Sequence, residues 1–215
     1  MSRMGALPST NLDGYSELKK RVEGAISFLQ EARSVEFKSA AEWHDLKHGL
    51  TKHILAMANL RDGGIVIVGI SETNNVWSIT GVTADQLDKY DPDDMIDHIN
   101  KYASPPIEFN VATHTTSENK DLLVIQVYEF EEKPIVCKRN CGNELREGAL
   151  YIRPVGKPES REVHNSDEMH DLLEVAAEKR TRSLLRQIQR VGIDLLTASS
   201  KRLDQDKFIA ELEGH

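Results

Sequence analysis

The chain has 215 residues, of which 39% are hydrophobic and 29% charged, and its formal net charge at pH 7 is −8. This composition fits a soluble globular protein with one substantial domain and an appendage, and it excludes a disordered chain. The longest apolar run falls short of the roughly 20 residues that cross a bilayer, so a membrane span is excluded. The acidic charge also argues against a protein that coats nucleic acid, so a nucleic-acid reader would have to concentrate its positive charge in one groove.

The first half of the chain predicts two helices and a buried strand. Apolar residues on spacings of three and four indicate a helix over 16–32 and a second helix over 42–58. The second helix ends at a glycine pair, Gly63-Gly64, which is typical of a tight helix–strand turn and is also compatible with a weak phosphate-binding loop. The continuous apolar run 65–70 then predicts a strand that is buried on both faces and is therefore central in its sheet.

A short strand over 34–38 is predicted between the two helices. Val35 and Phe37 alternate with Glu36 and Lys38, which is the period-two pattern of a strand with one buried face. We therefore expect a carboxylate and an ammonium group side by side on the exposed face of this strand.

The second half predicts further strands and a long terminal helix. A helix begins at Asp91-Pro92, where proline and acids suit the first turn, and ends before Pro105. Strands are expected over 107–113, 121–129 and 149–153, with a weaker one over 134–138. A long helix begins at Asn165-Ser166, with acidic residues early and basic residues late.

The expected fold is α/β (α+β), with a mixed central sheet flanked by helices and a long C-terminal helix. The strand at 65–70 is expected at its centre, flanked by the helix 42–58. The expected organisation begins with a flexible N-terminus over 1–16 and a single domain over 17–163. A C-terminal helical arm over 164–197 and a polar tail over 198–215 are expected to follow. The N-terminus lacks the apolar core of a signal peptide, which predicts a cytoplasmic protein.

Acidic residues near the first strand form the first candidate site. Divalent cations prefer oxygen ligands, and a metal that cuts phosphodiesters needs two or three converging carboxylates. Glu31 and Glu36 supply two, and Lys38 could orient water or offset charge on a phosphate. Glu72, just beyond the central strand, is the best-placed third acid, and Asp62, before that strand, is the alternative. An ordinary solvated strand face explains the same residues.

A basic segment forms the second candidate site. Tyr151 and Arg153 share one face of the strand 149–153, and an aromatic ring beside an arginine is a plausible platform for backbone and base contacts. A solvated hairpin is the alternative. The candidate nucleic-acid-binding residues are Lys138, Arg146, Tyr151, Arg153 and Lys157.

Cys137 and Cys141 are the only cysteines, which is too few for a disulfide framework. Their C-x3-C spacing suits half of a zinc site that His114, His164 or His170 would complete, but there is no second close ligand pair, so zinc is not expected. The arginine-rich half of the long helix is compatible with phosphate contact. It is equally compatible with dipole complementarity or with a dimer seam through Leu173, Leu184, Ile188 and Val191.

Taken in order, several segments resemble the Schlafen-type Alba-like domain, also named the divergent AAA or DNA-binding domain. They are "EARSVEFKSA", "KHILAMANLRDGGIVIVGISE", "SITGV", "VIQVYEF", "KPIV" and "LREGALYIRPVG". The resemblance covers residues 24–175. Its centre is the Glu-x4-Glu-Phe-Lys segment, followed by the glycine pair, the apolar strand and a Tyr-x-Arg strand.

The resemblance implies a metal-dependent endoribonuclease that cuts structured RNA, in particular tRNA. It places the metal carboxylates on Glu31, Glu36 and Glu72, with Lys38 beside them and Mg2+ or Mn2+ as the ion. This sequence has glutamate at the third position, where the family often has aspartate, and one extra residue between Asn59 and Gly63. A homodimer is expected because the related Schlafen core pairs two lobes across an RNA groove.

Two other classes of function remain open. One is a nucleic-acid-binding regulator that keeps the groove without cleaving its ligand. The other is an interaction or nucleotide-binding module, for which the chain has no Walker lysine motif. The three acids favour the nuclease, and the acidic overall charge favours the interaction module.

Overall fold

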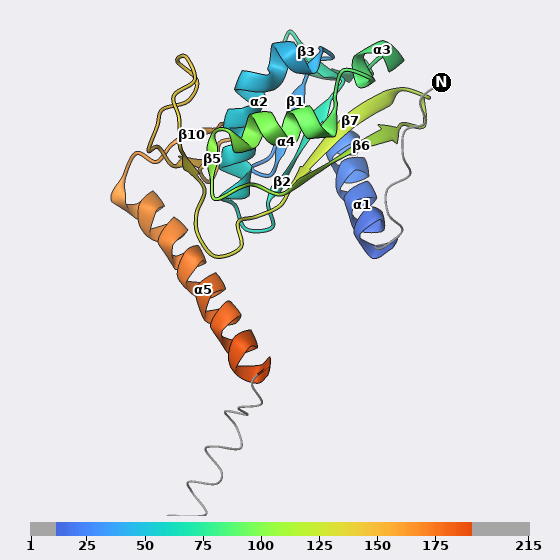
Figure 1. The fold of residues 1–215 in the computed structure, drawn as a ribbon. Helices are drawn as coiled ribbons and strands as arrows, with labels where there is room; N and C mark the ends of the chain where they lie inside the picture. Colours follow the sequence, from blue (N-terminus) through green and yellow to red (C-terminus); the bar gives the residue numbers. More distant parts are fainter. Residues whose placement is uncertain (1–11, 191–215) are drawn as a thin grey trace, which may run out of the picture.

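The computed structural model describes residues 12–190 (Figure 1). Their helices are α1 (Leu12–Phe28), α2 (Trp43–Ala58), α3 (Ala84–Leu87), α4 (Pro92–Asn100) and α5 (Ser166–Arg190). Their strands are β1 (Val35–Lys38), β2 (Gly64–Val68), β3 (Ile70–Thr73), β4 (Val76–Ile79), β5 (Ala103–Ser104), β6 (Phe109–Thr115), β7 (Asp121–Val127), β8 (Val136–Cys137), β9 (Tyr151–Ile152) and β10 (Arg161–Glu162). The predicted mixed α/β class with a long C-terminal helix is confirmed.

A four-stranded mixed sheet in the order β1-β2-β7-β6 forms the centre of the domain. β1 runs parallel to β2, and the other neighbours are antiparallel. β2 is buried along its whole length, which confirms the predicted central strand. Successive residues point to opposite faces, so Ile65 and Ile67 pack in the core on the α1 side while Val66 and Val68 pack in the core with α2 and α4.

The turn between α2 and β2 explains the glycine pair without a phosphate. Gly63 has φ +61°, and a Cβ atom there would lie 2.0 Å from the carbonyl oxygen of Val127. Asn59, at the end of α2, bridges two distant segments: its side chain donates to the carbonyls of Ile135 and Tyr151 and accepts from the Ile135 amide. The tight helix–strand turn is therefore the structural role of this motif.

The structure corrects several predicted boundaries. The first helix covers Leu12–Phe28 instead of 16–32, and the apolar run 65–70 is divided at Gly69, whose φ of +108° separates β2 from β3. The prediction missed the β3–β4 hairpin. Its turn residues Asn74 and Asn75 both have positive φ, as a two-residue type I′ hairpin turn requires, and asparagine favours this conformation. The predicted polar tail 198–215 lies outside the described residues.

α5 leaves the body of the domain and projects away from it (Figure 1). Near its start, Leu172 is buried in the core on the α2 side, and Val175 and Ala176 pack against that core. In residues 12–190, no helix combines the length and apolar character that crossing a membrane requires.

Candidate functional site

Glu36 lies in the interior of the domain, and the prediction that it lies on an exposed strand face is wrong. Its neighbour Phe37 packs on the α1 side of the sheet, so the Glu36 side chain points to the α2 side. Only 4% of the Glu36 side chain is exposed, and its Oε1 atom accepts a hydrogen bond from Lys38 Nζ at 2.5 Å. The Lys38 side chain is 28% exposed, so it closes the solvent side of this pair.

Arg153 binds the second carboxylate oxygen of Glu36. Its side chain is fully buried, and Nη1 donates to Glu36 Oε2 at 2.7 Å. Nη2 donates to the carbonyls of Ala32, Val35 and Pro158 at 3.1–3.2 Å. The guanidinium group thereby joins the segment after β9 to β1 and to the turn before it.

His53 and Ser160 complete the cluster around Glu36. The Nε2 atom of His53, on α2, lies 3.2 Å from Glu36 Oε1, and its Nδ1 atom lies 2.9 Å from Ser160 Oγ. Burial lowers the pKa of His53 to about 4, with the Lys38 and Arg153 charges adding to the effect against the opposing charge of Glu36. The ring is therefore neutral at pH 7. Its Nε2–H donates to the carboxylate, and its Nδ1 accepts the Ser160 hydroxyl proton.

The charges in this cluster keep Glu36 ionised. Burial alone would raise its pKa, but the adjacent Lys38 and Arg153 cations hold that pKa below its usual range. The result is a buried carboxylate that is compensated by two cations, which is the condition under which a buried charge is tolerated.

Glu31 and Glu72 line one surface cleft next to this cluster. The cleft has a volume of about 480 Å3 and is also lined by Arg33, Trp77 and Lys157. Glu31 Oε1 accepts a hydrogen bond from the Phe37 amide at 3.0 Å. Partial burial raises the Glu31 pKa, and the charge of the nearby Glu36 raises it further.

Glu72 shares this cleft with Glu31, whereas Asp62 does not line it. Glu72 is exposed on β3 and pairs with Trp77 across the hairpin. Asp62 precedes β2, at the opposite end of that strand, where its amide donates to Glu129 Oε2. The third acid on the Glu31 side is therefore Glu72.

The donor chemistry of Glu31, Glu36 and Glu72 suits a divalent cation, but in the observed arrangement Glu36 has no free oxygen for it. Both Glu36 oxygens already bind cationic side chains. Within residues 12–190, no three His, Cys, Asp or Glu side chains come together in a way that would hold a metal ion. A metal at these three acids would require Lys38 to release Glu36.

The predicted basic residues occupy different environments. Tyr151 and Arg153 are 3% and 0% exposed, so the predicted open platform is wrong for this pair. The Tyr151 hydroxyl accepts from the Arg146 amide at 2.8 Å. Arg146 is exposed and makes a bidentate ion pair with Glu162. Of the other two predicted residues, both exposed, Lys157 lines the cleft and Lys138 does not.

The two cysteines have separate environments. The buried Cys137 thiol donates to the Arg139 carbonyl at 3.1 Å, and Cys141 Sγ lies 3.0 Å from His48 Nδ1. Burial raises the pKa of Cys137, which favours the protonated thiol over the thiolate that metals bind.

Sequence reasoning missed His53, Ser160, Arg33 and Trp77. His53 adjoins the apolar stripe of α2, but its spacing gives no sign that it faces Glu36. Ser160 and Arg33 lie in loops, where periodicity carries no information. The Asn74-Asn75 turn would have identified the hairpin that carries Trp77 and Glu72, and it is the one usable signal.

The structure defines a mixed α/β lobe with a buried carboxylate–arginine cluster beside a surface cleft. The family model described as Schlafen, AlbA_2 matches residues 31–159, which is more than half of the chain. The chain belongs to the Schlafen AlbA_2 family. No curated protein matches it.

Two solved structures are similar to the chain. The DIP2311 protein from Corynebacterium diphtheriae is 21% identical with a TM-score of 0.47, and the match covers 69% of this chain and 30% of that one. The N-terminal domain of a RecG-related protein from Nitrosomonas europaea is 22% identical with a TM-score of 0.42, and the match covers 68% of this chain and 93% of that one. The chain thus spans less than a third of the Corynebacterium protein.

Proposed function

We propose that this chain binds nucleic acid through the cleft between Glu31 and Glu72, and that its ligand is RNA. One observation carries the proposal: the cleft combines two cations, an indole ring and two carboxylates. Arg33 and Lys157 suit phosphate oxygens, and Trp77, which is half-buried against Phe37, offers a surface for base stacking.

The two carboxylates favour RNA over DNA. A carboxylate such as Glu31 or Glu72 repels phosphate, but its oxygens can accept a hydrogen bond from a hydroxyl group. The 2′-hydroxyl is the donor that RNA has and DNA lacks. Membership of the Schlafen AlbA_2 family supports a nucleic-acid ligand independently of the cleft.

Fluorescence anisotropy of labelled tRNA, and of single-stranded RNA and DNA of one sequence, tests this proposal. We expect RNA to bind more tightly than DNA. Lys157→Gln should weaken binding for all sequences alike and reduce the salt slope by about 1, because phosphate contacts carry little sequence information. Lys89→Gln removes an exposed lysine outside the cleft and is the matched control. A purified chain that binds neither RNA nor DNA at low salt would refute the proposal.

A metal-dependent endoribonuclease acting on tRNA or other structured RNA is the second candidate. The observation in its favour is that Glu31 and Glu72 line one cleft beside Glu36, so a released Glu36 carboxylate would join two acids that already face solvent. Mg2+ or Mn2+ would be the ion, because three carboxylates offer only hard oxygen ligands.

Incubation of bulk tRNA with Mn2+, with Mg2+ and then with chelator tests for cleavage. Glu72→Gln is the most informative variant because Glu72 is exposed and its loss should not disturb folding. We expect cleavage to fall by orders of magnitude while RNA affinity stays similar or rises, since one negative charge is removed. Glu118→Gln, an exposed acid elsewhere, is the control. Cleavage that survives both chelator and Glu72→Gln would refute a metal site at these acids and leave the binding function.

We also propose that the chain forms a homodimer through α5. Leu173 and Leu184 are each 52% exposed on the helix, and Ile188 lies on the same side of it. The fourth residue of the predicted seam, Val191, lies outside the described residues. Light scattering at micromolar concentration, with and without RNA, should give twice the monomer mass. A monomer under both conditions would contradict the proposal.

A further inference from the structure

The side of α5 that packs on the domain changes from apolar to cationic along the helix. Leu172 and Val175 pack into or against the core near the start of α5. At about 100° per residue, Arg182, Arg186 and Arg190 lie within about 80° of Val175 around the helix axis. The face that holds the helix to the body therefore continues as a row of arginines. In Figure 1, α5 extends away from the body toward its C-terminal end.

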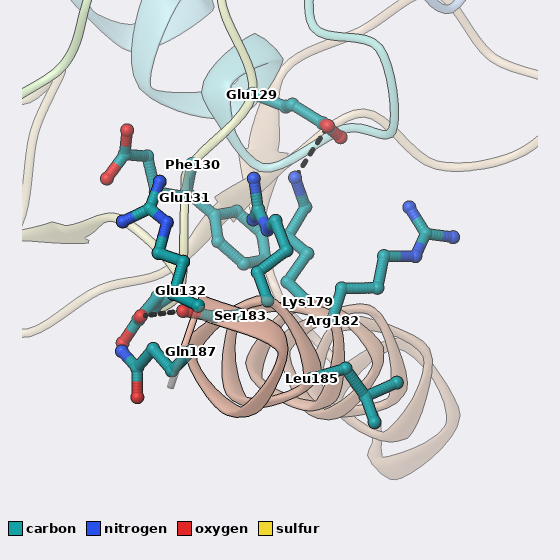
Figure 2. Close-up of a pocket in the computed structure, with 11 residues that line it drawn as sticks. Glu129, Phe130, Glu131, Glu132, Lys179, Arg182, Ser183, Leu185 and Gln187 are labelled. Atoms are coloured by element: carbon teal, nitrogen blue, oxygen red, sulfur yellow. Dashed lines mark hydrogen bonds and ion pairs between the residues drawn. The ribbon is translucent and has the colours of Figure 1, made fainter. Parts of the chain in front are cut away.

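This row lines a wide surface groove. The groove has a volume of about 960 Å3 and lies between the second half of α5 and residues 129–132 (Figure 2). Its walls include Lys179, Leu185 and the three arginines. Four residues of helix rise about 6 Å, so the three arginines follow one another along the helix at about that interval.

The acidic residues of the groove are largely satisfied by other cations. Glu129 pairs with Lys179 at 2.6 Å. Glu132 binds Arg180 at 2.5 Å and the Ser183 hydroxyl at 2.7 Å. In Figure 2, the Arg182 guanidinium points away from these carboxylates.

Arg182 has one weak acidic neighbour in the described chain. Arg182 Nη2 lies 3.8 Å from Glu178 Oε2. The Glu178 carboxylate already makes a bidentate ion pair with Arg61, with distances of 2.7 and 2.9 Å. Arg186 and Arg190 make no ion pair within residues 12–190. Glu131 is the remaining carboxylate of the groove, so the three arginines give this wall a net positive charge.

We propose that the groove between α5 and residues 129–132 is a second nucleic-acid contact that binds the phosphate backbone. This inference rests on the proposed RNA-binding function and extends it from the Glu31–Glu72 cleft to α5. Arginine suits the role because its planar fork binds phosphate oxygens in a bidentate manner. Phosphates follow one another at about 3.4 Å of duplex axis on each strand, so arginines about 6 Å apart along the helix supply roughly one cation for every two phosphates of one strand.

The arginine row and the proposed dimer seam do not compete for one surface. Leu184 lies about 200° around the helix from Arg182, and Leu173 lies about 180° from it. The exposed leucines and the arginines therefore occupy opposite sides of α5, so a dimer could form through one side while the other binds RNA.

The test replaces Arg182, Arg186 and Arg190 together by glutamine. Glutamine keeps helix propensity and polarity, and all three residues are exposed, so the variant should fold. The matched control replaces Lys20, Lys89 and Lys101, exposed lysines outside the groove, by glutamine with the same change in net charge. The affinity for labelled tRNA is measured from 50 to 200 mM salt for both variants, for Lys157→Gln and for the unmodified chain. Circular dichroism checks the helix content.

We expect the arginine variant to reduce the salt slope by about 2 to 3 and to lower affinity at least tenfold at 100 mM salt, while the lysine control changes little. If Lys157→Gln weakens binding but the arginine variant equals the control, the inference is overturned and the proposed function stands. If the unmodified chain binds no RNA, the proposed function fails and the inference fails with it. If poly-glutamate binds the unmodified chain as tightly as tRNA does, and the arginine variant loses this binding, the groove is assigned to an acidic protein segment. That result would also overturn the inference.

Discussion

Replacement of Arg153 by methionine should destabilise the domain strongly. If Arg153 were a surface residue that only binds phosphate, the same replacement would leave the free energy of unfolding almost unchanged. The guanidinium group is fully buried and donates to Glu36 and to three backbone carbonyls. Methionine has a similar length but no donor, so it leaves the Glu36 carboxylate with Lys38 and the neutral His53 as its remaining partners.

The structure sets the magnitude of this effect. Removing one partner of a buried ion pair costs about 3–5 kcal/mol, and the part-exposed Lys38 that still pairs with Glu36 places this change near the lower end of that range. The carbonyls of Val35 and Pro158 also lose a donor, which adds about 1 kcal/mol or more for each one that water cannot reach. The total approaches the whole stability of an ordinary domain, which is about 5–15 kcal/mol.

Urea denaturation followed by circular dichroism measures the change, with Arg33→Met as a comparison at an exposed arginine. A double variant, Glu36→Met with Arg153→Met, should recover part of the loss, because removing both charges avoids an unpaired one. A loss below about 1 kcal/mol for Arg153→Met, or a double variant that is no more stable than the single one, would refute the assignment of Arg153 as the internal partner of Glu36.

Three further outcomes are expected from the geometry. The pKa of His53 is about 4 in the folded chain and about 6.5 in the unfolded chain, so only the unfolded chain takes up this proton as pH falls from 6.5 to 4. The free energy of unfolding should therefore drop by about 3 kcal/mol in that window. Urea denaturation of the unmodified chain and of His53→Asn over a series of pH values measures this drop. Asn59→Ala should lower the free energy of unfolding by about 2–4 kcal/mol in the same assay. It removes two buried hydrogen bonds with the backbone of Ile135 and one with the carbonyl of Tyr151. Gly63→Ala should prevent correct closure of the turn against Val127, which soluble yield and thermal melting would report; normal stability would contradict the strained geometry.

The sequence predicted the elements whose signals are local. The apolar run of β2 needs no partner to be identified as central, and the capping and charge pattern of α5 marks its start. The glycine pair was correctly interpreted as a turn because a helix precedes it and a strand follows it. These features depend on residues within a few positions of one another, so periodicity and turn chemistry were sufficient.

The candidate site was only partly predictable because its contacts are long-range. The sequence identified Glu31 and Glu36 as a pair, but it placed Glu36 on the exposed face of its strand. Alternation along β1 separates two faces without saying which is covered. The cover over Glu36 comes from His53 on α2 and from Arg153, 117 positions along the chain, and only the tertiary fold brings them together.

The two candidate functions make opposite demands on a single exposed ammonium group. Arg153 Nη1 holds Glu36 Oε2 from the interior, and Nη2 is bound to backbone carbonyls, so this oxygen stays committed while the domain is folded. Lys38 holds Oε1 from the solvent side, where its side chain is 28% exposed. A protein that only binds RNA keeps Lys38 on Glu36, and the cleft then presents Glu31 and Glu72 alone. A metal-dependent nuclease needs Lys38 to move, which would free one oxygen of Glu36 toward the other two acids and leave the ammonium group available for a phosphate.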